Sequence, residues 1–278
     1  MSRPAILLTN DDGIDAPGLA ALYEELTAIG SVTVIAPRRN RSGVGRTRNG
    51  SVTVDDHPWG YRVRGTPADC VAFGLGGGVE TEFDFVVAGV NDGPNIGNYV
   101  IGRSGTAGAC VEAAFLDTPA IAVSAYHTED FHCYPAEDYE FDRPASLARE
   151  LLTALQRRGV PSDLGFVNVN APVDRPSPPI RLTRPVADYS QRVEYESDGD
   201  GTEGAVELID KTWPHVDGYE NPLEEAAAYK NRYPESSDRR ALIAGAVSIS
   251  PLSLPHSVVE SPALDELVEE LGPAGASG

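Results

Sequence analysis

Residues 5–29, AILLTNDDGIDAPGLAALYEELTAI, decide the fold. Ala5–Thr9 is an almost continuous apolar run, which is typical of a strand buried on both faces of a parallel sheet. A polar loop follows, and Pro17 then opens a helical segment that extends to about Ile29. Proline suits the first turn of a helix because its missing N–H is not needed there. The stretch therefore predicts a buried strand, a loop and a helix.

Segments of these two kinds recur along the chain. Further strands are expected at Val32–Ile35, Ser51–Val54, Tyr61–Arg64, Phe83–Ala88, Ala120–Ser124 and Phe166–Val169. Helices are expected after the N-cap and first-turn pair Thr66-Pro67, at Gly105–Leu116 and at Pro144–Arg158. Loops are expected at Gly89–Arg103 and at the acidic, aromatic stretch Tyr126–Arg143, which reads as a surface loop. The alternation predicts the α/β class with a doubly wound, mainly parallel sheet.

Residues 181–278 are expected to extend a core formed by residues 1–180. They begin with a polar, hairpin-like part that contains the turn residues Asp198-Gly199-Asp200-Gly201. The other expected segments are a short helix, an apolar closing segment and a C-terminal helix, at Pro222–Asn231, Ala241–Ile249 and Leu264–Leu271. Because this part is polar and rich in turn residues, it is not expected to fold as an independent domain. We expect it to join the core and to pack on a partner subunit.

The charge of the chain limits its partners. The formal net charge is −20, and only Lys211 and Lys230 among the 22 basic residues are lysines. Such a surface repels nucleic acid polymers and anionic membranes, since both are bound through basic charge. A small phosphorylated substrate is compatible with this charge if a metal reverses the field locally. An acidic, lysine-poor chain predicts adaptation to high salt, with an ordinary acidic protein as the alternative.

Several features indicate a cytoplasmic protein. The cysteines Cys70, Cys110 and Cys133 are odd in number, and their spacing fits neither CxxC nor a disulfide framework. They are expected to be core residues or free thiols in a reducing compartment. The N-terminus shows no signal peptide pattern, and no apolar run approaches the roughly 20 residues that span a bilayer.

Four polar clusters follow the expected strands or begin the expected helices. They are Asn10-Asp11-Asp12-Gly13, Asn40-Arg41-Ser42-Gly43, Asn91-Asp92-Gly93-Pro94-Asn95 and Ser104-Gly105-Thr106. Open α/β sheets bind ligands outside the carboxyl ends of their parallel strands. We therefore expect these clusters, although distant in sequence, to meet at one edge of the sheet.

The adjacent carboxylates of Asp11 and Asp12 favour a metal site. Two neighbouring carboxylates repel each other when both are ionised, and a divalent cation relieves that repulsion. Ser42 and Asn91 could add a hydroxyl and an amide oxygen, and such hard ligands favour Mg²⁺, Mn²⁺ or Ca²⁺. The alternative for Asn10–Gly13 is a tight turn that caps a helix, because these residue types favour turns.

Ser104-Gly105-Thr106 favours a phosphate. A helix N-terminus offers backbone N–H groups and the positive end of the helix dipole, which together suit an anion. The alternative is that Ser104 is an N-cap and nothing more.

The motifs together resemble those of the SurE family of nucleotidases, which remove phosphate from nucleoside monophosphates. The resemblance covers about the first 125 residues and one later motif. It rests on Leu8–Gly13, Ala36–Gly43, Gly65–Val71, Val90–Gly97, Ser104–Thr106 and Asn168–Pro172. The chain departs from the family in having Ala88-Gly89 where Ser-Gly is usual, and in having Asp92. The match from Asp238 to Pro251 is loose, so no role is carried over to C-terminal polar residues such as His256.

The resemblance implies a Rossmann-like core and a metal-dependent nucleotidase. It implies hydrolysis of nucleoside 5'-monophosphates, and it leaves 3'-monophosphates open as further substrates. The implied assembly is a homodimer or homotetramer whose subunits exchange their C-terminal parts, residues 181–278. It holds one divalent metal, Mg²⁺ or Mn²⁺, per subunit. The implied metal ligands are Asp11, Asp12, Ser42 and Asn91, with the two aspartates also catalytic. The residues implied to contact substrate or phosphate are Asn10, Asn95, Ser104, Gly105 and Thr106.

Two other functions are alternatives to phosphate ester hydrolysis. A dinucleotide-binding enzyme would carry G-x-G-x-x-G after its first strand, where this chain carries Asn10–Gly13. A nonenzymatic regulator that binds a metal or nucleotide would have a degraded site, whereas the ligand set here is complete. An aspartyl-phosphate mechanism is disfavoured because Asn10 stands where its first aspartate is needed.

Overall fold

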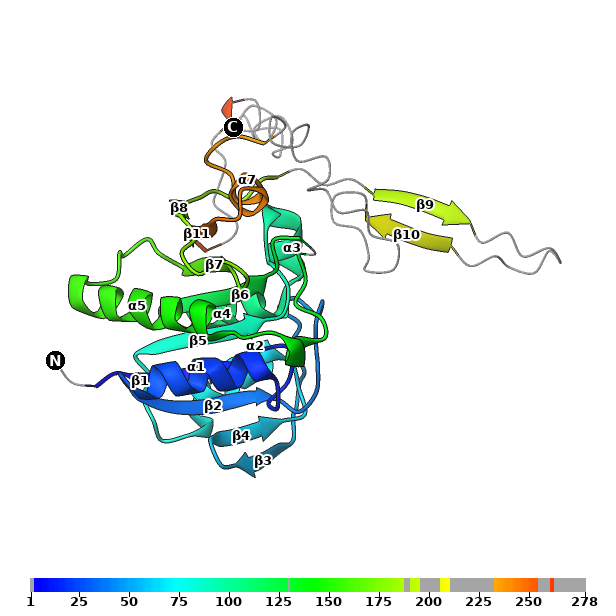
Figure 1. The fold of residues 1–278 in the computed structure, drawn as a ribbon. Helices are drawn as coiled ribbons and strands as arrows, with labels where there is room; N and C mark the ends of the chain where they lie inside the picture. The colour runs from blue at the N-terminus through cyan, green and yellow to red at the C-terminus, as the bar shows by residue number, and fades with distance from the viewer. Residues whose placement is uncertain are drawn as a thin grey trace, which may run out of the picture.

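The computed structural model describes residues 3–129, 131–187, 191–195, 206–210, 233–254 and 261–262. Its centre is a nine-stranded sheet in the order β3-β4-β2-β1-β5-β6-β7-β11-β8 (Figure 1). In chain order these strands are β1 Ala5–Thr9, β2 Ser31–Pro37, β3 Val54–His57, β4 Gly60–Val63, β5 Phe85–Asn91, β6 Ala120–Tyr126, β7 Phe166–Pro172, β8 Ile180–Leu182 and β11 Val247–Leu252. The predicted α/β class is confirmed.

The middle of the sheet is parallel. The neighbours β4, β2, β1, β5, β6 and β7 all run in the same direction. Strands β1, β5, β6 and β7 are almost wholly buried because helices cover both faces, which explains their continuous apolar sequences. β3 pairs antiparallel with β4 and β11 antiparallel with β7, while β8 runs parallel to β11 at the other edge.

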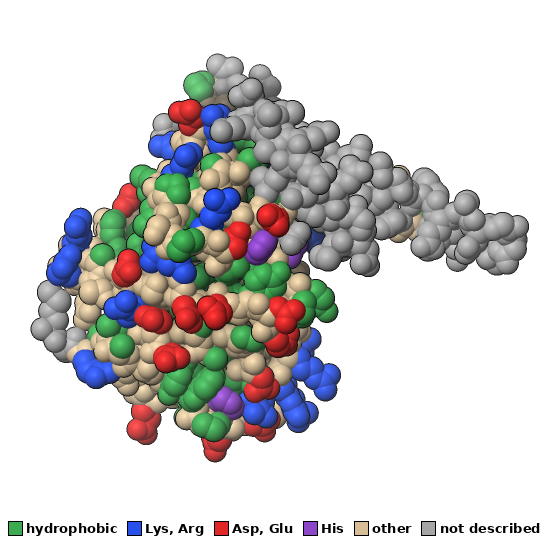
Figure 2. Space-filling view, in the orientation of Figure 1, with side chains coloured by type: hydrophobic (Ala, Val, Ile, Leu, Met, Phe, Trp, Pro, Cys, Tyr) green, Lys and Arg blue, Asp and Glu red, His purple; other side chains and the backbone are tan. Residues whose placement is uncertain are grey.

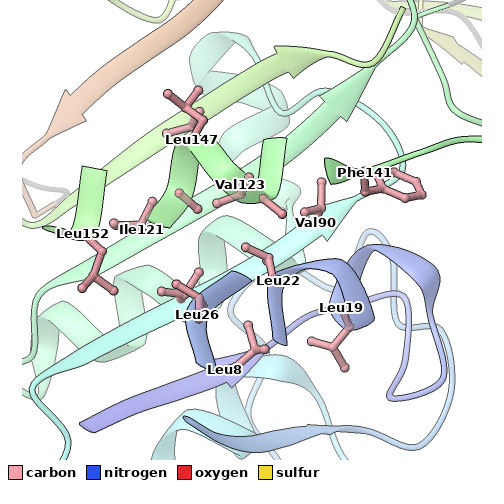
Figure 3. Close-up of a cluster of buried hydrophobic side chains, with 14 of the residues drawn as sticks. Leu8, Leu19, Leu22, Leu26, Val90, Ile121, Val123, Phe141, Leu147 and Leu152 are labelled. Carbon is pink, nitrogen blue, oxygen red and sulfur yellow. The ribbon is translucent and has the colours of Figure 1, made fainter. Parts of the chain in front are cut away.

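Helices cover the sheet in two layers. The helical segments are α1 Pro17–Thr27, α2 Pro67–Phe73 with a π-helical turn (η1) at Gly74–Gly78, α3 Gly97–Arg103, α4 Gly105–Phe115, a 3-10 turn (η2) at Ala136–Asp138, α5 Asp142–Arg158 and α7 Asp238–Ile243. α1 and α5 pack together on one face, and α2 and α4 pack together on the other. Figure 3 shows Leu19, Leu22 and Leu26 of α1 in the first layer. The core thus fixes the positions of the strand ends.

Some expectations about local structure were wrong. The predicted loop Gly89–Arg103 contains α3, and the apolar segment Ala241–Ile249 is divided between α7 and β11. The predicted surface loop Tyr126–Arg143 buries the side chains of Phe131, Cys133 and Phe141. Burial of the aromatic side chains of this stretch stabilises its packing against the core, although many of its other residues are acidic. Phe131 stacks on Tyr126 with 6.4 Å between the ring centroids.

The C-terminal part contributes to the sheet. β11 lies between β7 and β8, so the sheet is completed by strands from residues 180–252. β9 Gln191–Tyr195 and β10 Val206–Asp210 form a separate antiparallel pair that projects from the main body (Figure 1). The predicted turn at Asp198–Gly201, the predicted helices Pro222–Asn231 and Leu264–Leu271, and His256 all lie outside the described residues.

The three cysteines are free and buried, as the sequence predicted. Among the helices that the structure describes, none has the length and apolar character needed to cross a membrane.

Acidic side chains are spread over the face drawn in Figure 2. The formal charge of −20 creates self-repulsion that favours expansion of the chain. The Debye length falls from about 10 Å at 0.1 M salt to about 3 Å at 1 M, so most of this repulsion is screened at the higher concentration.

We therefore expect the melting temperature and any enzymatic activity to rise as KCl increases from about 0.1 M to above 1 M, the range over which screening becomes short-ranged. Thermal melts followed by circular dichroism across that series test this expectation. A melting temperature that stays flat or falls would show that the acidic surface has another cause.

Candidate active site

Loops from three strands meet the first turn of α4 at the carboxyl edge of the parallel strands. The backbone N–H of Arg41, in the loop after β2, donates to the carbonyl oxygen of Asp11 at 2.5 Å. The hydroxyl of Thr106 in α4 donates to Oδ1 of Asp11. Asp92, directly after β5, lies close enough to influence the pKa of Asp12. The four predicted clusters therefore do meet at one edge of the sheet.

The turn that presents the two aspartates is held by Asn10. Its Nδ2 donates to the carbonyl oxygen of Gly13 at 2.8 Å, and its Oδ1 accepts from the backbone N–H of Gly13 at 3.2 Å. Gly13 has a φ of 112°, which favours glycine, and a Cβ there would lie 3.1 Å from the backbone carbon of Arg39. Asn10 is fully buried and its side chain serves this turn. Contact of Asn10 with a substrate stays a prediction.

Asp11 is seated against the first turn of α4. Its side chain is buried, and burial raises the pKa of its carboxyl group. Hydrogen bonds from the Thr106 hydroxyl and from the backbone N–H groups of Thr106 and Gly105 act in the opposite direction. A Cβ on Gly105 would lie 2.7 Å from Oδ2 of Asp11, so the close approach depends on glycine. Asp11 is thus fixed in place before any ligand arrives.

The side-chain oxygens of Asp12 are buried and lack hydrogen bonds of normal geometry within the described chain. Neither of its side-chain oxygens accepts a hydrogen bond by normal distance and angle from the part of the chain that the structure describes. The pKa of Asp12 is raised to about 9, first by burial and then by the charges of Asp11 and Asp92. The nearby backbone N–H of Asp92 offsets it only in part. A buried carboxylate without a full set of hydrogen bonds is costly, and a nearby cation would stabilise its ionised form, so Asp12 is the residue of the site best suited to a cation.

Asp92 adds to the negative charge. The pKa of its carboxyl group is raised by burial first, then by Asp11, with a smaller contribution from Glu137. Within the described residues no group of three or more His, Cys, Asp or Glu side chains is arranged to hold a metal ion. A metal beside Asp11 and Asp12 would therefore need oxygen ligands of other kinds.

Asn91 and Ser42 can supply such oxygens. Asn91 ends β5, and its Nδ2 donates to the carbonyl oxygen of Gly93 at 2.5 Å, so its Oδ1 is the atom suited to a metal. Ser42 follows Arg41 in an exposed part of the loop after β2, where its backbone N–H donates to Oδ1 of Asn40 at 2.8 Å. The donor set of carboxylate, hydroxyl and amide oxygens fits a hard divalent cation. Ligation by Ser42 and Asn91 stays a prediction.

Asn95 anchors the loop after β5. Its backbone N–H donates to Oδ1 of Asn170 at 2.7 Å, and its Nδ2 donates to Oγ of Ser124 at 2.8 Å. Its carbonyl oxygen accepts from Nδ2 of Asn168 at 2.8 Å and from Nδ2 of Asn170 at 3.2 Å. The network holds this loop on β6 and β7. Ser124 was not singled out in the sequence, although a serine within the apolar strand β6 was a usable signal.

Ser104 caps α4. Its Oγ accepts from the backbone N–H of Ala107 at 3.0 Å, so the capping role that the sequence left open is confirmed. Thr106 is fully buried with its hydroxyl directed at Asp11. The phosphate contacts expected of Ser104, Gly105 and Thr106 stay predictions. The structure adds that the Thr106 hydroxyl has a protein partner already.

The segment after β6 lies against the site, which the sequence did not predict. The backbone N–H of Cys133 donates to the carbonyl oxygen of Asp92 at 2.8 Å. A Cβ on Gly93 would lie 2.7 Å from Nδ1 of His132. Burial lowers the pKa of His132, which favours its neutral form. Histidine and cysteine in an acidic, aromatic stretch gave no periodic pattern that could have located them.

Comparison with known proteins identifies the family of this chain. The family model described as survival protein SurE matches residues 6–192. A 5'-nucleotidase SurE of Haloarcula marismortui is 42% identical, over 98% of this chain and 97% of that protein. A 5'-nucleotidase SurE of Halobacterium salinarum is 43% identical, over 96% of this chain and 98% of that protein. The crystal structure of the SurE protein from Aquifex aeolicus superimposes with a TM-score of 0.73 at 30% identity, over 96% of this chain and 99% of that one. On its fold, its motifs and these relatives, the chain belongs to the SurE family.

Proposed function

We propose that this protein is a metal-dependent nucleotidase that hydrolyses nucleoside 5'-monophosphates to nucleoside and phosphate. The observation that carries the proposal is the buried, uncompensated carboxylate of Asp12 beside Asp11 and Asp92. Membership of the SurE family and the relatives named as 5'-nucleotidases support the same reaction.

The proposed cofactor is one Mg²⁺ or Mn²⁺ per subunit, held by Asp11, Asp12, Ser42 and Asn91. The buried oxygens of Asp12 fit such an ion because neither accepts a hydrogen bond of normal geometry in the described chain. When bound, a divalent cation polarises a phosphoryl oxygen, lowers the pKa of a water and offsets the charge of the transition state.

The protein's own groups then do the rest of the proposed reaction. The Asn10–Gly13 turn and Thr106 keep Asp11 in a fixed orientation. Asp11 or Asp12 orients the attacking water or accepts its proton, which requires the ionised form that a nearby cation favours. The remaining phosphoryl oxygens would contact Asn95 and the first turn of α4, where backbone N–H groups and the helix dipole favour an anion.

A nucleotide panel tests this proposal. The purified protein is freed of metal with a chelator and then supplied with Mg²⁺ or Mn²⁺, and release of inorganic phosphate is measured. We expect release from nucleoside 5'-monophosphates with metal and none without it. Full activity after exhaustive chelation would contradict the role of the metal. Metal and nucleotide binding without phosphate release would instead favour a nonenzymatic regulator.

We also propose that the protein acts in the cytoplasm on small substrates. Its charge of −20 disfavours nucleic acid polymers and anionic membranes as partners.

Association of subunits is a further expected result. The edge strand β8 exposes Ile180 and Leu182, and the β9–β10 pair exposes Val193, Val206 and Leu208. Isolated two-stranded hairpins are marginally stable in water, so we expect a partner chain to cover this part of residues 181–278. Light scattering should report a homodimer or homotetramer. A monomer at working concentration would contradict the expectation.

A further inference from the structure

Three arginines follow β2 within four residues of sequence. We call Arg38, Arg39 and Arg41 the arginine loop. All three are exposed. In the described part of the chain, no acidic side chain forms an ion pair with any of them, whereas Arg48 pairs with Asp69 and Glu112. Unneutralised positive charge gathered in one loop is unusual for a protein of net charge −20.

The backbone of the arginine loop is fixed beside the candidate metal ligands. The N–H of Arg41 lies 2.5 Å from the carbonyl oxygen of Asp11, and the backbone carbon of Arg39 lies 3.1 Å from the position of a Cβ on Gly13. The N–H of Arg38 donates to the carbonyl oxygen of Val63 at 2.8 Å. Three solvent-reaching guanidinium groups are therefore attached to backbone that touches the Asp11–Gly13 turn.

The negative charge of the site repels an anionic substrate, and the arginine loop offsets this repulsion. A phosphate monoester approaches as an anion, and it meets a negative protein whose site holds three neighbouring carboxylates, those of Asp11, Asp12 and Asp92. One divalent cation balances only two of these charges. Local charge of opposite sign raises the concentration of a charged substrate at a site and its association rate, by about 10- to 10³-fold.

We propose that the arginine loop, above all Arg39 and Arg41, attracts the phosphate dianion of the substrate to this site through long-range electrostatics. The inference rests on the proposed function, and it gives these arginines a role in substrate capture that is separate from metal binding and from the chemical step. Guanidinium groups suit phosphate because their planar donors match its oxygens. The attraction acts before the phosphate reaches Asp11 and Asp12.

A pair of matched double variants tests the inference. Arg39→Gln/Arg41→Gln removes two charges from the arginine loop. Arg157→Gln/Arg158→Gln removes the same charge from exposed positions at the end of α5. Because α5 leads into β7, this end of the helix lies at the amino end of that strand, away from the site. Steady-state kinetics with a nucleoside 5'-monophosphate are measured over a KCl series that begins at the lowest concentration at which circular dichroism shows all three proteins folded.

We expect Arg39→Gln/Arg41→Gln to lower kcat/KM by about tenfold or more at the low end of the series, with kcat unchanged. The deficit should shrink toward 1 M KCl, where the Debye length is about 3 Å. The α5 pair should stay within about twofold of the wild type, because α5 ends at the amino end of β7, on the side of the sheet away from the site. Equal deficits in both pairs, no deficit, or a deficit that does not change with salt would overturn the inference.

Two further measurements distinguish substrate attraction from metal binding, and failure of this inference from failure of the proposed function. Mn²⁺ affinity, measured by electron paramagnetic resonance, should be the same in the wild type and in Arg39→Gln/Arg41→Gln. A loss of Mn²⁺ affinity would instead make the arginines supports of the Ser42 loop and overturn the inference. If the wild type releases no phosphate from any nucleotide, the proposed function fails. Equilibrium dialysis of inorganic phosphate with the Mn²⁺-loaded proteins then still tests the arginine loop, with weaker binding expected in the loop variant alone.

Discussion

Asp12→Asn is expected to lower turnover of a nucleoside 5'-monophosphate by on the order of 10² or more, because it removes charge from the catalytic centre. Asp11→Asn should have an effect of similar size. Initial rates at saturating Mn²⁺ measure both. The matched control is Asp15→Asn, which changes an exposed aspartate three residues further along and should leave the rate unchanged.

Stability distinguishes loss of chemistry from loss of fold in these variants. Burial raises the pKa of Asp12 to about 9, so at neutral pH the metal-free protein must take up a proton on Asp12 when it folds, and this uptake costs stability above the pKa of the unfolded chain. Asp12→Asn should therefore melt no lower than the wild type in metal-free buffer. Wild-type kinetics in both aspartate variants would refute their assignment to the catalytic centre.

Thr106→Val is expected to weaken Mn²⁺ affinity by about 10- to 100-fold, the range for residues that orient metal ligands through a hydrogen bond. The Thr106 hydroxyl donates to Oδ1 of Asp11 in a fully buried position, and valine would remove this side-chain donor while the backbone donors remain. Thr106→Ser keeps the hydroxyl and should bind Mn²⁺ much as the wild type does. Isothermal titration calorimetry with Mn²⁺ compares the two variants.

Ser42→Ala and Asn91→Ala give the reference for direct ligands. Both should lose Mn²⁺ affinity, and excess metal should partly restore their activity. If Thr106→Val behaves as they do, the threonine serves the metal through Asp11. If it keeps its Mn²⁺ affinity and instead raises KM for the nucleotide, the phosphate contact that the sequence predicted for Thr106 is correct.

Local sequence was sufficient to predict the parallel core. An apolar run such as Ala5–Thr9 can be satisfied only by burial on both faces, and Pro17 sets the start of α1 through its own backbone geometry. The same logic failed for the stretch Tyr126–Arg143. Its burial depends on whether Phe131 and Phe141 find partners across the chain, which residues near in sequence do not reveal.

The sequence by itself determined the α/β class, the family motifs and the gathering of four polar clusters at one sheet edge. The class follows from the alternation of strand and helix patterns, the gathering follows from the rule that parallel strands end on the same side, and the motifs rest on resemblance to the family. Only the tertiary structure decided how each side chain is used. It directs the hydroxyl of Thr106 to Asp11, uses Asn10 in the turn and Asn95 in the loop anchor, and gives the buried oxygens of Asp12 no hydrogen bond of normal geometry from the residues that it describes. Such choices depend on distances between atoms far apart in the chain, because a buried polar group takes whichever partner the packed backbones bring within about 3 Å.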